Sequence, residues 1–200
     1  MSRERVLSDS ELRAIWRAAD SLSNPGRSFV KALILSGQRR DEVRCLPWAE
    51  IDLDRALWLL PAARTKPKRD HEIPLTPAML ALLCDRPQEG GPVFTVDGRK
   101  AYAGQQELKA ILDRESGVTG WTYHDIRRTV ATGMAALNIP QDAIDKVLNH
   151  SRGRLAGTYN RHRYLDERRR VLEVWAERVA IIVGDGRDAP NVIELHGAGG

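Results

Sequence analysis

The sequence predicts a mainly α-helical domain with a small three-stranded antiparallel β-sheet, an α+β fold. Apolar residues recur at helical spacing near the amino terminus and again from about residue 104 onward. Between these parts, residues 50–75 hold three short, partly alternating apolar segments separated by polar turns. At 200 residues, the chain is long enough for one sizeable core but too short for two ordinary domains joined by a linker.

Three helices are predicted ahead of the sheet. Ser8 is a good N-cap for a first helix that runs to about Asp20, and Pro25-Gly26 separates this helix from the next. The second helix is largely apolar, and we expect it to stop at Gly37, because glycine readily takes the left-handed cap conformation. A third, short helix is predicted from Asp41 to Leu46.

The strands are predicted at Glu50–Asp54, Ala56–Leu60 and His71–Leu75. The segment Ala63–Asp70 would then form an exposed basic hairpin between the second and third strands. This hairpin would reach far from its sheet.

The rest of the chain is predicted to be mostly helical. Thr76-Pro77 opens a helix through about Cys84, and a Pro/Gly-rich loop at Pro87–Pro92 leads to the short apolar segment Val93–Val96. Further helices are expected at about 104–115, 123–137, 140–149 and 165–183. The apolar residues expected in a core or interface are Trp16, Trp48, Trp58, Leu148 and Trp175.

Composition narrows the function classes. Lys and Arg number 31 against 27 Asp and Glu, a formal charge of +4 that permits a polyanionic partner without requiring one. Cys45 and Cys84 form no C-x-x-C pair, which argues against a disulfide scaffold or a zinc site. The polar start and the lack of a long apolar stretch predict a soluble, cytoplasmic protein without a membrane partner.

The first segment that suggests chemistry is Gly37-Gln-Arg39-Arg-Asp-Glu42. An arginine follows a helix-ending glycine, and a carboxylate three residues later can hold it. Arg39 would then be aimed at an anion. Taken alone, a solvated charged turn explains this short match more simply.

The second segment is the cationic hairpin Arg64-Thr-Lys66-Pro-Lys68-Arg69. Its lysines can contact phosphate oxygens, or one of them can donate a proton to a departing oxygen. A hairpin kept soluble by charge is an equally good interpretation of this segment by itself.

The third segment, Thr122 to Arg128, is more specific. Thr122 and Asp125 form a capping pattern that places His124 in the first turn of a helix, with Arg127 one turn later on the same face. Backbone N–H groups and the helix dipole favour an anion at such a helix start. A lone histidine there is more often a structural hydrogen-bonding group.

The fourth segment holds His150, in Leu148-Asn-His, and Tyr159 nine residues later. An exposed tyrosine needs no special function. Two arginines, two histidines and a lysine around it, however, would stabilise the growing negative charge of a pentacoordinate phosphate.

Together these motifs resemble the tyrosine recombinase (phage integrase) family. The shared order is Arg in G-x-R-x-x-E, Lys in a β-hairpin, H-x-x-R, L-x-H, and Tyr nine residues further. Each motif is short, but their order and spacing extend from Leu12 to Arg161. The resemblance implies a DNA-integrating or DNA-excising enzyme of a phage or mobile element.

The resemblance also implies roles for the central residues. Tyr159 would attack the scissile phosphate and leave a 3′-phosphotyrosine, so no cofactor, ATP or metal is needed. Arg39 and Arg127 would hold the non-bridging oxygens, and His124 would assist proton transfer with the tyrosine.

The remaining roles are supporting ones. Lys66 would be the general acid for the 5′ leaving oxygen, with Lys68 as the alternative. His150 would contact the phosphate or position the nucleophile, and Glu42 would orient the first arginine. The candidates for DNA-backbone contacts are Lys68, Arg69, Arg128, Arg152, Arg154 and Arg161.

By the same resemblance, residues 1–183 are the catalytic domain and residues 184–200 a flexible tail. Family members carry an amino-terminal core-binding (clamp) domain that this chain lacks, so we expect a fragment of a recombinase. Its partner would be double-stranded DNA, with a free monomer and a homotetramer on DNA whose 165–183 helix packs on a neighbour. We expect it in the bacterial cytoplasm, associated with the nucleoid.

Two alternatives remain open from the sequence. A type IB topoisomerase would use the same chemistry to relax supercoils, although the G-x-R-x-x-E and L-N-H motifs favour a recombinase. A DNA-binding module could keep the fold and lack cleavage activity, although the full set of catalytic residue types argues against it.

Overall fold

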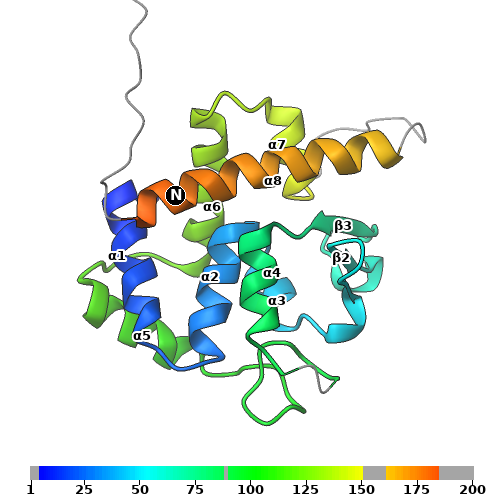
Figure 1. The fold of residues 1–200 in the computed structure, drawn as a ribbon. Helices are drawn as coiled ribbons and strands as arrows, with labels where there is room; N and C mark the ends of the chain where they lie inside the picture. Colours follow the sequence, from blue (N-terminus) through cyan, green and yellow to red (C-terminus); the bar gives the residue numbers. More distant parts are fainter. Residues whose placement is uncertain (1–4, 88–89, 151–160, 185–200) are drawn as a thin grey trace, which may run out of the picture.

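A computed structural model of the chain describes residues 5–87, 90–150 and 161–184, with side chains of the last segment from residue 164. It confirms the mainly helical fold with a small antiparallel sheet (Figure 1). The helices are α1 (Asp9–Asp20), α2 (Gly26–Ser36), α3 (Arg40–Arg44), α4 (Pro77–Cys84), α5 (Gln105–Ser116), α6 (Tyr123–Ala136), α7 (Gln141–Val147) and α8 (Arg161–Val183).

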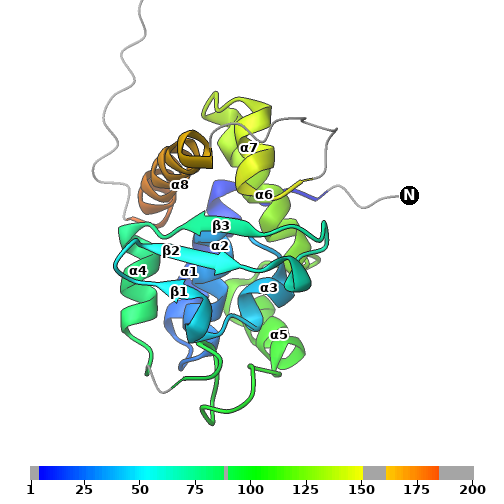
Figure 2. The ribbon, with the colours of Figure 1, turned by 90° about the vertical axis from the view of Figure 1, so that its right-hand side faces the viewer.

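The sheet contains β1 (Ile51–Asp52), β2 (Leu57–Leu60) and β3 (His71–Pro74), in that order and antiparallel (Figure 2). The strands are shorter than the sequence predicted. Glu50 belongs to the 3-10 turn η1 (Trp48–Glu50), and the Asp52 carboxylate accepts a hydrogen bond of 2.9 Å from the Arg55 backbone N–H. This side-chain bond replaces strand pairing with a tight turn.

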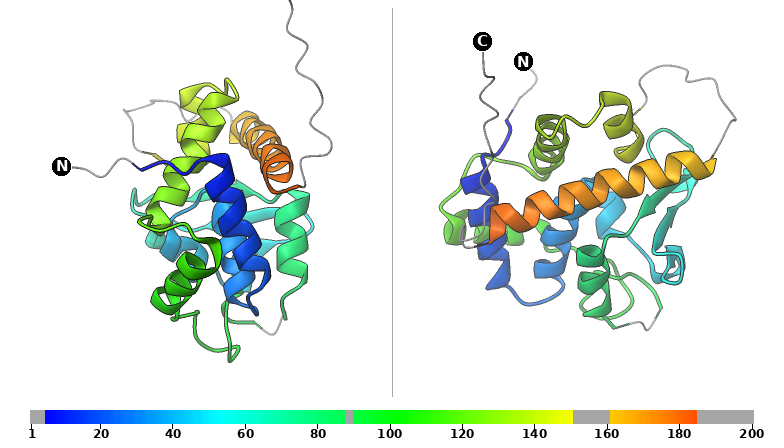
Figure 3. Two further views of the ribbon diagram at one scale, coloured as in Figure 1. Left: turned by 90° about the vertical axis from the view of Figure 1, so that its left-hand side faces the viewer. Right: turned by 45° about the horizontal axis from the view of Figure 1, so that its top comes forward.

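The core is built around α2, of which every residue but Arg27 is buried. It contacts α1, α4, α6 and α8, and α8 lies beside α6 and α7 and across the end of the α1–α2 pair (Figures 1 and 3). Trp175 of α8 is fully buried, and its indole N–H donates to the Ile34 carbonyl at 2.8 Å. A Cβ at Gly133 of α6 would come within 2.4 Å of this indole, so glycine permits the close packing.

The end of α2 places the first site residues. Gly37 has φ +61°, the left-handed cap conformation that the sequence predicted. A Cβ at this position would lie 2.8 Å from Val130 of α6 and 2.9 Å from Leu148 after α7. The glycine therefore brings the end of α2 into contact with two distant parts of the chain.

Several boundaries differ from the prediction. The third helix begins at Arg40 and ends at Arg44, earlier than expected, since Pro47 does not continue a helix. The short apolar segment at 93–96, to which the sequence assigned no helix or strand, forms neither, although Thr95 makes an isolated bridge to Ala101. The last helix begins at Arg161, four residues ahead of the predicted start.

Burial of the predicted core aromatics is mixed. Trp58, Leu148 and Trp175 are buried, whereas Trp16 and Trp48 are partly exposed and pack against the core. Across residues 5–87, 90–150 and 161–184, no helix combines the length and apolarity needed to cross a bilayer.

Candidate active site

Arg39 is the N-cap of α3 and is held by Glu42. The buried Glu42 carboxylate accepts from the Arg39 backbone N–H at 3.1 Å and from its Nη1 at 3.0 Å. Nη2 of Arg39 lies 3.4 Å from the carbonyl of Asn149. The predicted orienting contact is therefore present, and the arginine side chain remains 27% exposed toward solvent.

His124 occupies the first turn of α6, as the capping pattern predicted. The Thr122 backbone N–H donates to the Asp125 carboxylate at 2.9 Å, which fixes the helix start. The His124 side chain is exposed, and partial burial together with the charges of Arg128 and Arg127 lowers its pKa. The imidazole is therefore neutral at pH 7 and able to accept a proton.

Arg127 points into the protein at the base of the site. Its Nη1 donates to the Gly37 carbonyl at 2.8 Å, and its Nη2 donates to the Leu148 carbonyl. Burial and the positive charge of Arg39 lower its pKa to about 10, which still leaves it charged at neutral pH. Two arginines of different helices thus lie close enough to interact.

The lysine hairpin lines the same cavity as these three residues. After the 3-10 turn η2 (Ala62–Arg64), Thr65 is buried, whereas Lys66 and Lys68 are exposed. Lys68 has φ +56°, so the loop turns sharply there. Within the described part of the chain, neither ammonium group has a hydrogen-bond or ion-pair partner.

His150 follows the end of α7. Its Nδ1 lies 3.1 Å from a carboxylate oxygen of Asp145, and its backbone N–H donates to the Asp145 carbonyl at 2.9 Å. Burial lowers the pKa of His150, while the Asp145 contact acts in the opposite direction. The imidazole is held on one side and partly exposed on the other.

Carbonyls at the end of α7 connect these residues. The last carbonyls of a helix have no partner within it, and here side chains from other elements supply the donors. The contacts are Gln38 and His71 to Val147, Arg127 to Leu148, Arg39 to Asn149, and Arg69 to His150. The segment 147–150 therefore serves as a common support for both arginines and for the hairpin.

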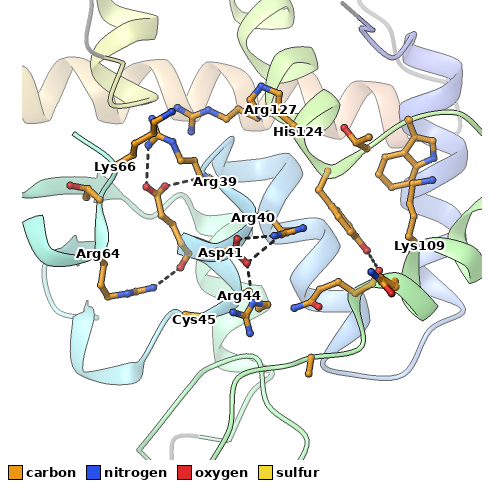
Figure 4. Close-up of a pocket in the computed structure, with 18 of the residues that line it drawn as sticks. Arg39, Arg40, Asp41, Arg44, Cys45, Arg64, Lys66, Lys109, His124 and Arg127 are labelled. Carbon is orange, nitrogen blue, oxygen red and sulfur yellow. Dashed lines mark hydrogen bonds and ion pairs between the residues drawn. The ribbon is translucent and has the colours of Figure 1, made fainter. Parts of the chain in front are cut away.

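An open cavity of about 1440 Å³ lies between α3, the hairpin and the starts of α5 and α6. Figure 4 shows Lys66, Arg39, His124 and Arg127 on one side of it, from three segments: the hairpin, the start of α3 and α6. Eight Lys or Arg side chains line the cavity against three Asp or Glu. His150 is not in its lining, although the backbone next to His150 holds Arg39.

The remaining predicted residues lie outside the described structure. Tyr159, Arg152 and Arg154 belong to residues 151–160, and the side chain of Arg161 at the start of α8 is also outside it. The roles of these four residues stay predictions.

The chemistry that this cavity favours is anion binding. Fixed guanidinium groups and an exposed lysine suit a phosphate group better than a neutral ligand. Among the described residues, no group of three or more His, Cys, Asp or Glu could hold a metal ion.

Sequence reasoning gave no role to several residues of the cavity wall. Arg64 donates to the Glu42 carbonyl at 2.9 Å and forms an ion pair with Glu50. Asp41 accepts from Arg40 at 2.8 Å and from Arg44 at 3.1 Å, and these contacts lower the pKa of Asp41 (Figure 4). The close spacing of Arg40, Asp41 and Arg44 could have signalled the second group, but the Arg64 contacts are not local.

Comparison with known proteins places the chain among integrases. A sequence profile of the phage integrase family matches residues 5–165. Prophage integrase IntA of Escherichia coli (strain K12) is 32% identical over 165 residues, which cover 80% of this chain and 40% of that protein. Prophage integrase IntZ of the same organism is 30% identical, over 88% of this chain and 46% of its own length. The chain thus spans less than half the length of these relatives.

Solved structures share the fold. The catalytic domain of bacteriophage HP1 integrase superposes with a TM-score of 0.60 at 14% identity, covering 94% of this chain and 99% of that one. A lambda integrase(75-356) dimer bound to a COC' core site gives a TM-score of 0.60 at 18% identity, covering 76% and 59%. At 14% and 18% sequence identity, these two structures show a shared fold and nothing more.

Proposed function

Because the chain belongs to the phage integrase family, we propose that it is the catalytic domain of a site-specific DNA recombinase. It cuts and rejoins DNA through a 3′-phosphotyrosine, with Tyr159 as the nucleophile. The observation that carries this proposal is the convergence of Arg39, Lys66, His124 and Arg127 on one cationic cavity, from three separate segments.

The arginines stabilise the transition state. Arg39, held by Glu42, and Arg127, held by two carbonyls, present fixed donors to the non-bridging oxygens of the scissile phosphate. Because these groups are already oriented, they need little reorganisation as negative charge grows on phosphorus.

The bond changes balance without an external reactant. The phenolic oxygen of Tyr159 forms a bond to phosphorus, and the bond from phosphorus to the 5′ oxygen breaks. Neutral His124 takes the phenolic proton, and the ammonium group of Lys66 gives a proton to the departing 5′ oxygen. His150 contacts the phosphate or positions the nucleophile, and the reverse sequence rejoins a strand.

Double-stranded DNA is the proposed substrate. Proteins of the same fold have been solved as DNA complexes, such as XerH site-specific recombinase bound to difH substrate, which superposes with a TM-score of 0.60. The basic cavity supports the same partner for this chain, with Arg128, Arg152, Arg154 and Arg161 as further backbone contacts. We propose a monomer free in the bacterial cytoplasm and a tetramer on nucleoid DNA, with α8 at the contact between protomers.

The experiment is a covalent-trapping assay. The chain is incubated with a nicked duplex that carries a junction of the encoding element, and the products are separated under denaturing conditions. An adduct in wild type that is absent in Tyr159→Phe is the expected result.

The length of the relatives adds a second arm to this assay. The chain is tested alone and joined behind an amino-terminal clamp domain, since it spans 40% and 46% of the relatives described above. Adduct only in the longer form means that the catalytic domain needs the clamp. DNA binding without adduct in both forms would reject the enzyme and leave a binding module.

A further inference from the structure

We infer that Arg69 is a positioning residue that fixes the Lys66 hairpin against the segment 149–150. The inference rests on the proposed function, because it assigns Arg69 a task in the cleavage step. It differs from the phosphate contact that the sequence suggested for this arginine, and the two roles give different experimental results.

The Arg69 guanidinium joins two parts of the chain that are 80 residues apart in sequence. Nε donates to Oδ1 of Asn149 at 2.6 Å, and Nη2 donates to the carbonyl of His150 at 3.0 Å. Asn149 is 2% exposed and has φ +52°, a conformation that asparagine tolerates better than most residues. The acceptor is therefore a rigid, buried group rather than a mobile surface side chain.

The backbone of Arg69 is equally well fixed to the lysine loop. The buried hydroxyl of Thr65 accepts from the Arg69 N–H at 3.1 Å and lies 2.9 Å from the Arg69 carbonyl, to which it can donate. This hydroxyl closes the base of the loop that contains Lys66 and Lys68. A displacement of Arg69 would therefore carry Lys66 with it.

The loop has a second support at its other end. Arg64 donates to the Glu42 carbonyl, while Arg69 contacts Asn149, whose own carbonyl is near Arg39. The two arginines thus fasten the loop to α3 on one side and to the segment after α7 on the other. Lys66 lies between these supports, so its distance to a phosphate held by Arg39 depends on both.

Loss of the Arg69 contacts should shift the position of Lys66, the proposed general acid, while leaving its ammonium group present. A displacement of about 1 Å can cost on the order of 100-fold in rate, and partial loss of one support should cost about 10-fold. We expect this slowing in Arg69→Ala. We expect it equally in Arg69→Lys, because an ammonium group retains the charge but cannot bridge the two acceptors in the same way.

A substrate with sulfur in place of the 5′-bridging oxygen tests whether Arg69 affects cleavage through the proton that Lys66 donates. Breaking its P–S bond places the electron pair on a thiolate, which leaves without a proton from Lys66. If Arg69 acts through Lys66, both Arg69 variants are slow on the oxygen substrate and approach wild type on the sulfur substrate. Arg55→Ala is the matched control, since it removes an exposed arginine from the turn between β1 and β2.

Other outcomes overturn the inference. Equal slowing on both substrates would show an action other than through the acid. Weaker DNA binding with a salt slope reduced by about 0.9, restored in Arg69→Lys, would show a phosphate contact instead.

A measurement without DNA separates this inference from the proposed function. Hydrogen exchange of the free protein should accelerate at the Lys68, Arg69 and His150 amides in Arg69→Ala but not in Arg55→Ala. Unchanged exchange would overturn the anchoring role. If wild type formed no adduct, the proposed function would fail, and exchange would still decide whether Arg69 anchors the hairpin.

Discussion

The base and the rim of the cavity are built in opposite ways. At the base, Arg127 is 5% exposed, and both ends of its guanidinium group donate to main-chain carbonyls. At the rim, Lys66 and Lys68 are exposed, and their ammonium groups have no partner within the described residues. The side chain at the base is thus fixed by its own hydrogen bonds. The lysine side chains at the rim are placed only by the loop that carries them.

The difference matches two chemical needs. A group that stabilises charge must stay charged, and arginine does so even where burial lowers its pKa to about 10. A group that donates a proton needs a removable one and contact with solvent for its return. Lysine on an exposed loop meets this need, so the two regions should respond differently to substitution.

The largest effect is expected at the base, from Arg127→Ala. Two buried carbonyls would lose their donor, so the free energy of unfolding should fall by about 2–4 kcal/mol. Adduct formation should slow by a further factor of about 10²–10³ at a temperature where the variant is folded. Denaturant unfolding and the trapping assay measure these changes.

Arg114→Ala is the control for that variant, because this side chain is 72% exposed on α5. It should change stability by less than about 0.5 kcal/mol. An Arg127 variant that is as stable as wild type would contradict the description of the base.

At the rim, Lys66→Ala should slow cleavage by about 10²–10³-fold, the usual contribution of a general acid. Its stability should stay unchanged, because no described contact of the ammonium group is lost. Lys68→Ala is the paired variant, and a larger loss there would identify Lys68 as the acid. A destabilised Lys66 variant would remove the distinction between base and rim.

Local contacts explain what the sequence could predict. The Gly37 cap, the Thr122 and Asp125 capping pair and the Arg39 to Glu42 contact each lie within a few residues. Such contacts leave a readable pattern, so the starts of α1 and α6, the end of α2 and the contact between Arg39 and Glu42 agree with the prediction.

Contacts between distant segments left no comparable pattern. The bonds from Arg69 to Asn149 and from Arg127 to Gly37 join residues 80 and 90 positions apart. Arg69 was therefore expected to contact DNA, and its contacts with the segment 149–150 could be found only from the fold. The resemblance to a family explained the order of the motifs along the chain, but it did not predict these contacts of Arg69 and Arg127.

A smaller effect, on the free energy of unfolding, is expected from His71 as the pH is lowered. His71 is buried, its Nε2 lies 3.0 Å from the Val147 carbonyl, and burial and the charge of Arg168 lower its pKa to about 3. The unfolded chain, with an ordinary pKa near 6.5, binds a proton before the folded one does. Stability from His71 is therefore complete above about pH 6.5 and is lost as pH falls toward 3.

Denaturant unfolding across this range measures the effect. Wild type should lose about 2–3 kcal/mol more than His71→Gln between pH 6.5 and 4, because glutamine keeps a donor but does not titrate. The same slope in both proteins would show that His71 is not the group responsible.

The smallest effect is expected from Asp145→Asn, which changes the carboxylate beside His150. Burial lowers the pKa of His150 and the Asp145 carboxylate opposes this, so neutralising the carboxylate should lower the pKa of His150 further. The amide oxygen still accepts a hydrogen bond, so stability should change little and cleavage should slow only about three- to tenfold, the loss of a modest charge contact.

The control for this variant lies on the same helix. Asp142→Asn removes an exposed ion pair with Lys146 and leaves His150 untouched. NMR titration of the His150 ring should show the downward shift in Asp145→Asn alone. If Asp142→Asn shifted it equally, the general charge of α7, rather than one oriented carboxylate, would govern His150. His150 would then differ from Arg127: hydrogen bonds to two carbonyls hold Arg127, whereas the overall charge of α7, and no single contact, would set the pKa of His150.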